Sequence, residues 1–451
     1  MTLLTRRNLL RFGSGALAYS FARNLGGFGL ANAYAQAAAP DYKALVAIFL
    51  FGGNDGNNTL VPIDNTGYSA YARARSLLAL PRASLLPIQP GNIAQPYGLH
   101  PALPKMQSLF NARKAALVAN VGTLLRPLTR AQAQADGAPL PFNLLSHIDQ
   151  QTQWQTAQLS QPVDTGWGGL IAERLQTLSP TASYPPAVTL AGASAFCEGE
   201  RIHAASVGTD GASALDGVNP SDGSPLSTAL QQLLAFDSGL TLIQAASGRT
   251  STALAEARTL GQAFVGAPAL TTAFPASELG LQLQQVARII QARGRLGLQR
   301  QVFFAALDGF DTHSRQLPDQ AALLGQVDAA LDAFYRATQE LGVDTQVTAF
   351  TLSDFGRTLQ ANSSAGSDHA WGNHHLVVGG AVQGGNLYGT YPTLLPAGPD
   401  DASDEGRWIP TTALDQYGAT LARWFGVGDA ALPAVFPNLM AFTSRTLPFL
   451  V

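Results

Sequence analysis

The residues best suited to chemistry are concentrated in one stretch near the C-terminus, residues 350–382. It contains Asp354, His369, His374 and His375, so three of the seven histidines of the chain fall within it. Only 13% of all residues are charged, and these carboxylates and imidazoles lie beside Gly-rich turns. Such a concentration indicates a site for a metal ion or a phosphate-type group.

Three apolar runs typical of buried parallel strands are each followed by an aspartate. The runs and their aspartates are residues 44–51 with Asp55, 301–307 with Asp311, and 345–352 with Asp354. Because the carboxyl ends of parallel strands meet at one edge of a sheet, we expect the three side chains to lie together there. At each position taken alone, the preference of aspartate for turns is the alternative explanation.

Carboxylates that meet at one edge favour a cation between them. Two of them ~4 Å apart repel by ~1 kcal/mol in water, and by several times more where water is scarce. A divalent cation removes this repulsion, and nearby histidines extend the ligand set. The candidate metal ligands are Asp55, Asp311, His313, Asp354, His369 and His374. Asp and His together suit Zn²⁺, Mn²⁺ or Fe, whereas an all-oxygen set suits Mg²⁺ or Ca²⁺, with one ion or two.

The histidines of the stretch differ in how freely they can face such a site. His374 and His375 are neighbours in an expected strand, so their side chains point to opposite faces and only one can reach a given site. His369 lies in a Gly/Ser-rich loop and has no such constraint. His369 is therefore favoured over both.

Two further residues suit a reaction on an anionic ester. Ser146 is expected at the N-cap of a helix, where the helix dipole and free N–H groups also favour a nucleophile or a bound oxyanion. Arg357 follows Asp354 by three residues and is a candidate for holding an anionic substrate. A simple helix cap at Ser146 and a surface ion pair at Arg357 are the alternatives.

The elements that would position these residues form an α/β pattern. The helical face expected over 319–341 joins the apolar runs 301–307 and 345–352 into a strand–helix–strand unit with parallel strands. Further strands are expected at 115–121 and 188–190. Between residues 204 and 295 we expect a Gly/Ser-rich loop followed by helices near 225–235, 250–264 and 276–294, as an insertion or lid.

Length and composition narrow the class of protein. A chain of 451 residues with 46% hydrophobic residues is long enough to bury a large core. A net charge of -3 without a basic block argues against a nucleic-acid partner. The single cysteine, Cys197, excludes an intrachain disulfide and is expected to be an ordinary buried residue.

The N-terminus has the pattern of a targeting segment. Residues 1–37 contain the pair Arg6 and Arg7, a mildly apolar run, and small-residue cleavage sites near Ala35. The uncharged run is far shorter than the ~20 residues that span a bilayer, so no stable transmembrane anchor is expected. The twin-arginine export machinery is thus an expected partner, with a periplasmic or secreted location and a mature domain over 38–451.

Eight motifs follow one another along the chain in a recognisable order. They are FGGNDGNNTLVP, LHPAL, LSHIDQQ, TGWGG, GFDTHS, LSDFGRT, GSDHAWGNHH and GGAVQGG. In these motifs the chain resembles the bacterial exported family of the domain of unknown function 1501, from about Ala44 to Leu439. That family looks like a distant branch of the alkaline phosphatase and sulfatase superfamily. The resemblance implies a three-layer α/β/α sandwich with a mostly parallel central sheet and a two-metal site.

Residue by residue, the resemblance implies roles that the chain matches only in part. Asp55 resembles the first metal-binding aspartate, Ser146 the nucleophile, and His369 a later metal-binding histidine. Asp311 and His313 resemble an Asp–His pair, although one residue separates them where the superfamily usually has three. Phe355 stands where the superfamily has a metal-binding histidine, which argues against a full two-metal site and leaves one metal or none open.

Two main hypotheses follow for function. The first is an exported, metal-dependent hydrolase of phosphate or sulfate esters that uses Ser146 and the Asp and His ligands. The second is a non-catalytic envelope protein with a degenerate site that binds an anionic glycan or a protein partner. It is motivated by the metal ligand that is missing at Phe355. An oxidoreductase with an exported cofactor is a third, supported only by the export signal and the Gly-rich loop after residue 51.

Overall fold

The computed structural model describes residues 41–209, 224–236 and 239–450. The predicted targeting segment, residues 1–37, lies outside this part of the chain. A nine-stranded sheet forms the centre, in the order β11-β5-β10-β9-β1-β8-β6-β7 with β12 paired to β5. Its strands are β1 Lys43–Leu50, β5 Ala115–Gly122, β6 Ala187–Thr189, β7 Ala205–Ser206, β8 Arg300–Leu307, β9 Val347–Ser353, β10 Asn373–Gly379, β11 Leu387–Tyr388 and β12 Thr412–Ala413.

All but one of these strands run in the same direction. Strand β10 is antiparallel to both its neighbours, and every other pairing in the sheet is parallel. A smaller antiparallel sheet packs near one end and consists of β2 Leu60–Pro62, β3 Leu86–Ile88 and β4 Tyr97–Leu99.

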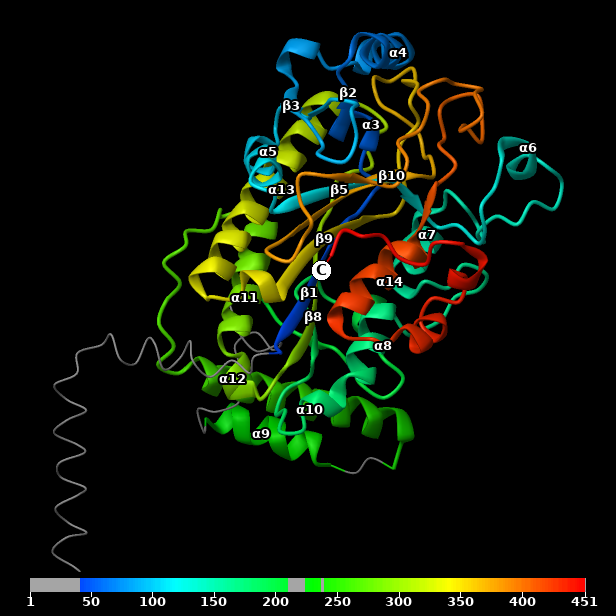
Figure 1. The fold of residues 1–451 in the computed structure, drawn as a ribbon. Helices are drawn as coiled ribbons and strands as arrows, with labels where there is room; N and C mark the ends of the chain where they lie inside the picture. Colours follow the sequence, from blue (N-terminus) through cyan, green and yellow to red (C-terminus); the bar gives the residue numbers. More distant parts are fainter. Residues whose placement is uncertain (1–40, 210–223, 237–238, 451) are drawn as a thin grey trace, which may run out of the picture.

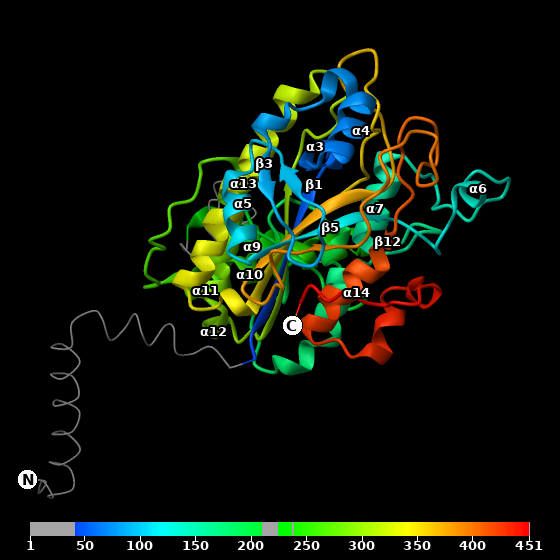
Figure 2. The ribbon, with the colours of Figure 1, turned by 45° about the horizontal axis from the view of Figure 1, so that its top comes forward.

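Helices cover both faces of the central sheet (Figures 1 and 2). One face carries α5 Pro104–Asn111, α11 Glu278–Gln291 and α13 Gln316–Glu340. The other carries α7 His147–Thr156, α8 Trp167–Arg174 and α14 Leu414–Phe425. Along β1, Val46 and Ile48 enter the first core while Ala47 and Phe49 enter the second, as the two-residue period of a strand requires. The predicted three-layer α/β/α sandwich is therefore confirmed.

The remaining helices lie outside these two layers or are short. They are α3 Gly56–Thr59, α4 Asn65–Arg75, α6 Arg130–Ala133, α9 Pro225–Leu234, α10 Thr241–Phe264 and α12 Arg293–Leu296. Within the region predicted as an insertion, α9 and α10 lie beyond the β7 edge of the sheet, whereas α11 packs in the helical layer against α13 and β8 (Figure 1). In the described part of the chain, no helix is long and apolar enough to cross a membrane.

The central strands end level with one another at the edge where the aspartates were expected. Leu50 at the end of β1 is in register with Leu307 of β8 on one side and Ser353 of β9 on the other. The chain leaves β1 through Gly52, whose φ of +108° suits glycine, and a Cβ there would lie 2.3 Å from the backbone nitrogen of Asp311. The loops after β1 and β8 consequently touch.

Candidate functional site

Four side chains converge above this edge around the carboxylate of Asp311, and we call them the imidazole cluster: His147, Asp311, His313 and His369. The Oδ1 atom of Asp311 lies 3.0 Å from Nε2 of His313 and 3.5 Å from Nε2 of each of the other two histidines. The Nε2 atoms of His313 and His369 are 2.9 Å apart. Single ligand atoms of His147, Asp311 and His369 all lie within 4.8 Å of one another, which is the spacing of groups that share a metal ion.

The four members of the cluster come from three segments of the chain. His147 is the first residue of α7, Asp311 and His313 follow β8, and His369 lies in the loop between β9 and β10. The segments meet because β8 and β9 flank β1 and because α7 packs on the sheet face beside β9. Phe355, just after β9, supports two of the rings, with its centroid 4.8 Å from that of His147 and 4.5 Å from that of His369.

The Nδ1 atom of each imidazole is held by an oxygen acceptor. In His147 it is 2.7 Å from Oδ2 of Asp354, in His313 it is 2.9 Å from Oδ1 of Asp368, and in His369 it is 2.8 Å from the carbonyl oxygen of Leu145. These contacts favour the tautomer that carries its proton on Nδ1 and leave each Nε2 lone pair directed at the cluster. Metal-binding histidines in proteins are characteristically oriented in this way.

One polar atom of the cluster lacks the hydrogen bond that its burial calls for. Nε2 of His147 is buried and makes no hydrogen bond with any residue that the structure describes. A buried nitrogen lone pair without a donor is unfavourable, and a bound cation would satisfy it. The residues present thus fit a divalent metal ion.

The electrostatics of the cluster follow from its neighbours. The hydrogen bond to Asp354 raises the pKa of His147 above its usual value, whereas burial lowers the pKa of His369. Partial burial acts to raise the pKa of Asp311, but the hydrogen bond and the charge of Arg357 outweigh it, so the pKa lies below its usual value. Asp311 is therefore ionised at neutral pH and available as an anionic ligand.

Residues 42–403 match the family described as "Protein of unknown function (DUF1501)". The chain belongs to the DUF1501 family. Among curated proteins, none matches the sequence.

Solved structures resemble the DUF1501 chain only in part. The C-terminal periplasmic domain of EcEptC from Escherichia coli, in complex with Zn, is 10% identical at a TM-score of 0.29, covering 76% of this chain and 74% of that one. The lipoteichoic acid synthase LtaP from Listeria monocytogenes is 10% identical at a TM-score of 0.33, covering 89% and 78%. The phosphonate monoester hydrolase of Agrobacterium radiobacter is 12% identical at a TM-score of 0.34, covering 88% and 77%.

Of the metal ligands predicted from the DUF1501 sequence, three lie in the cluster and three do not. Asp311, His313 and His369 belong to it. Asp354 contacts the cluster only through His147. Its carboxylate accepts hydrogen bonds from His147, Gln151 and the backbone nitrogen of Gly52. The other two, Asp55 and His374, are buried outside the cluster.

Asp55 and His374 are both engaged by other groups. The Asp55 carboxylate accepts hydrogen bonds from Arg75, Gln316 and the backbone nitrogen of Asn57. His374 is in β10, where its Nδ1 accepts a hydrogen bond from the backbone nitrogen of Asn120 at 3.0 Å. Burial lowers the pKa of His374 to about 3, so its ring is neutral.

Ser146 and Arg357 both adjoin the cluster. Ser146 precedes α7, and its hydroxyl donates to Oδ2 of Asp149 at 2.7 Å instead of accepting a helix N–H. Arg357 is fully buried and donates to Asp311 and to the backbone oxygens of Gly52, Gly53, Phe310 and Ser367.

His147 is the site residue that the sequence analysis did not single out. A signal for it was present, because His147 and Gln151 are four residues apart at the start of a helix and therefore share one face. Both contact the same oxygen of Asp354. Leu145 also contributes to the site, because its carbonyl oxygen accepts a hydrogen bond from His369. Leu145 has a φ of +77°, which is a strained conformation for leucine.

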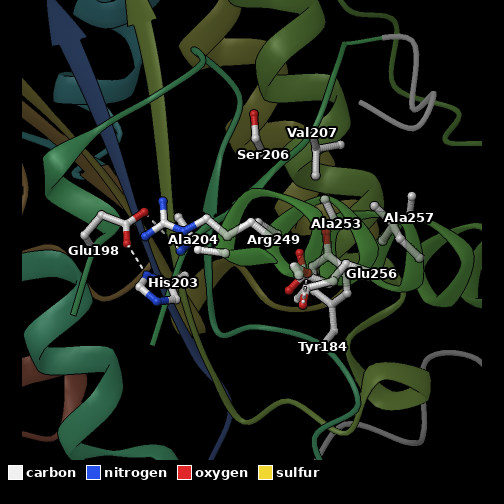
Figure 3. Close-up of a pocket in the computed structure, with 15 residues that line it drawn as sticks. Tyr184, Glu198, His203, Ala204, Ser206, Val207, Arg249, Ala253, Glu256 and Ala257 are labelled. Carbon is white, nitrogen blue, oxygen red and sulfur yellow. Dashed lines mark hydrogen bonds and ion pairs between the residues drawn. The ribbon is translucent and has the colours of Figure 1, made fainter. Parts of the chain in front are cut away.

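A separate cavity of about 370 Å³ lies far along the sheet from the cluster, between α10 and the edge strand β7 (Figure 3). Its lining includes Tyr184, Glu198, His203, Arg249 and Glu256. His203 and Glu198 pair there, with 2.9 Å between Nδ1 and Oε2. None of the predicted site residues lines this cavity.

Proposed function

We propose that the imidazole cluster binds a divalent metal ion and that the protein is a metal-dependent hydrolase of phosphate or sulfate esters. The observation that supports this most is the convergence of three histidine Nε2 atoms on Asp311, with each Nδ1 held by an oxygen. His147, Asp311 and His369 would hold the ion, and His313 lies beside them as a fourth ligand. Imidazoles with one carboxylate favour Zn²⁺ among the common ions.

A bound ion would act as a Lewis acid on an ester oxygen or lower the pKa of a bound water. The residues of the chain supply the rest. Asp354 orients His147, the Leu145 carbonyl orients His369, and Arg357 holds Asp311. Ser146, next in sequence to His147, is the candidate nucleophile, and Asp149 is the acceptor positioned to take the hydroxyl proton.

A second function is favoured by one observation. Phe355 contacts His147 and His369 where the family resemblance led us to expect a further ligand. A site reduced in this way suits a non-catalytic envelope protein that binds an anionic glycan or a protein partner. Such a protein would keep its cellular role when Ser146 is replaced by alanine.

The test uses the purified full-length protein. Its metal content is measured by elemental analysis, and hydrolysis of p-nitrophenyl phosphate, bis-p-nitrophenyl phosphate and p-nitrophenyl sulfate is followed before and after chelation. We expect bound metal and activity in the parent protein and loss of both in His147→Ala. His203→Ala, which changes an exposed histidine remote from the cluster, should retain both. Absence of metal and of hydrolysis in the parent protein would refute the proposal.

We also propose that the protein acts outside the cytoplasm, after export by the twin-arginine route. The support is the Arg6–Arg7 pair followed by a mildly apolar run and small-residue cleavage sites. This route suits a protein that folds and takes up its metal before it crosses the membrane.

A further inference from the structure

A buried ion pair occupies the first of the three strand-end aspartates. Asp55 and Arg75 contact each other with both side chains fully buried. The guanidinium of Arg75 also donates to Oδ1 of Asn58 at 3.0 Å and to the backbone oxygens of Thr358 and Leu359 at 2.7 and 2.9 Å. With Gln316 and the Asn57 nitrogen as further donors, both oxygens of Asp55 are satisfied without a metal.

The third strand-end aspartate is occupied as well. Oδ1 of Asp354 accepts from the backbone nitrogen of Gly52 at 3.1 Å, and Oδ2 accepts from His147 and Gln151. Its side chain has no exposed surface. Of the three aspartates, only Asp311, whose side chain is 48% exposed, has a carboxylate that an ion can approach.

We infer that the site holds a single divalent cation and that Arg75 is a permanent positive charge at Asp55, where a second ion would otherwise bind. Displacing this guanidinium would leave a buried arginine without its charged partner, which is strongly unfavourable. This inference rests on the proposed function and deepens it, because the number of ions sets the charge of the substrate that the site can accept.

The charges around the cluster favour a substrate with one negative charge. Three carboxylates belong to the cluster or contact one of its histidines: Asp311, Asp354 and Asp368. One guanidinium, that of Arg357, pairs with Asp311. One divalent cation therefore makes the group neutral. Arg357 is held by Asp311 and four backbone oxygens, and the nearby Arg407 is held by Glu405 at 2.8 Å and by the carbonyl oxygen of His369.

A second negative charge on the substrate would find no free cation among these described residues. A sulfate monoester or a phosphate diester carries one negative charge, whereas a phosphate monoester carries nearly two above its second pKa of about 6. The structure thus assigns monoanionic esters as the preferred substrates of the site.

The first part of the test counts ions. Elemental analysis of the full-length protein should give one divalent ion per chain, and Asp55→Asn, which can still accept hydrogen bonds, should leave that count unchanged. His147→Ala should remove the ion. Because Asp55→Asn removes the charged partner of the buried Arg75, its fold is checked by circular dichroism before the ions are counted. Two ions per chain in the parent protein, or loss of the ion in a folded Asp55→Asn protein, would overturn the inference.

The second part compares substrates with the same leaving group. We expect kcat/KM at pH 8 for p-nitrophenyl sulfate or bis-p-nitrophenyl phosphate to exceed that for p-nitrophenyl phosphate by at least about tenfold, the effect of one unneutralised charge. The ratio should narrow at pH 5.5, where the monoester gains a proton. Equal rates, or faster hydrolysis of the monoester at pH 8, would overturn the assignment of substrates. One bound ion without hydrolysis of any ester would instead refute the proposed hydrolase and this assignment while leaving the ion count standing.

Discussion

At the scale of single residues, the cluster depends on groups that do not belong to it. Asp354 is buried and contacts His147 at 2.7 Å, and Asp368 contacts His313 at 2.9 Å. A carboxylate behind a histidine makes the imidazole a stronger ligand and fixes its ring. The same pairing raises the pKa of His147, so proton and metal compete for this ring.

Replacing Asp354 by asparagine should therefore weaken metal binding without removing a ligand. We expect a drop in affinity of about 10- to 100-fold, as is typical for partners that orient metal-binding histidines. A competitive titration with a chromogenic chelator measures it. Asp332→Asn, which changes surface ion pairs with Lys105 and Arg336 on α13, is the matched control and should bind like the parent protein. Equal affinity in Asp354→Asn would show that the carboxylate does not act on the cluster.

At the scale of elements, the ends of three strands are joined by one side chain. Arg357 follows β9 and donates to backbone oxygens of the loops after β1 and β8, at Gly52, Gly53 and Phe310. It also holds Asp311. The sheet edge and the site above it are consequently stabilised by the same guanidinium.

Arg357→Met should destabilise the fold strongly, because it leaves several buried oxygens without this donor. We expect a loss of about 3–5 kcal/mol in the free energy of unfolding, measured by urea denaturation. Arg336→Met, at an exposed ion pair on α13, should cost at most about 1 kcal/mol. Similar losses of unfolding free energy in the two variants would show that Arg357 does not stabilise the loops after β1 and β8.

The start of helix α14 provides a pH-dependent test of another element. Asp415 is fully buried in its first turn and accepts from the backbone nitrogen of Asn438 at 2.8 Å. Burial raises the pKa of Asp415 from 3.8 to about 7. Between these two values the folded chain binds a proton that the unfolded chain does not, so the stability should fall as the pH rises from 4 to 7 and change little above that.

Asp415→Asn should remove this dependence while keeping an oxygen acceptor for Asn438. Relative to the parent protein, the variant should gain on the order of 4 kcal/mol between pH 4 and pH 8, from 1.36 kcal/mol per pKa unit. Urea denaturation across this range measures it. Asp429→Asn, at an exposed pair with Arg423, should follow the pH profile of the parent protein. A parallel profile in Asp415→Asn would show that Asp415 titrates normally.

At the scale of the whole molecule, the topology determines which residues meet. Strand β1 lies between β8 and β9, so the crossover through α13 passes over one strand and brings the residues after β8 and β9 to either side of the loop after β1. Helix α7 then adds His147 from the opposite helical layer. The site is assembled from three segments that are well separated in the chain, at residue 147, residues 311–313 and residue 369.

Export of the whole protein can be tested through its N-terminal arginines. We expect the double variant Arg6→Lys with Arg7→Lys to remain in the cytoplasm, because the twin-arginine route requires the arginine pair. Cell fractionation and detection of the full chain measure the distribution. Arg23→Lys, outside the pair, is the control and should be exported. Unchanged export of the double variant would argue for another route.

The long central strands of the fold could be predicted from the sequence, whereas most of the short strands and the partners of the side chains could not. Continuous apolar runs marked β1, β5, β8 and β9 to within two residues, because a strand buried on both faces needs apolar residues at every position. Helix α10 begins at Thr241, well before the predicted start, since the face of its first turns is largely exposed and shows no apolar period.

The sequence by itself determined that three aspartates follow parallel strands and that histidines lie close to two of them. Only the tertiary structure decided what each carboxylate meets: Arg75 at Asp55, His147 at Asp354, and the imidazole cluster at Asp311. The physical reason is that local pattern sets where a strand ends, whereas the donor that reaches a buried oxygen depends on how distant helices pack. The spacing of residues along the chain does not specify that packing.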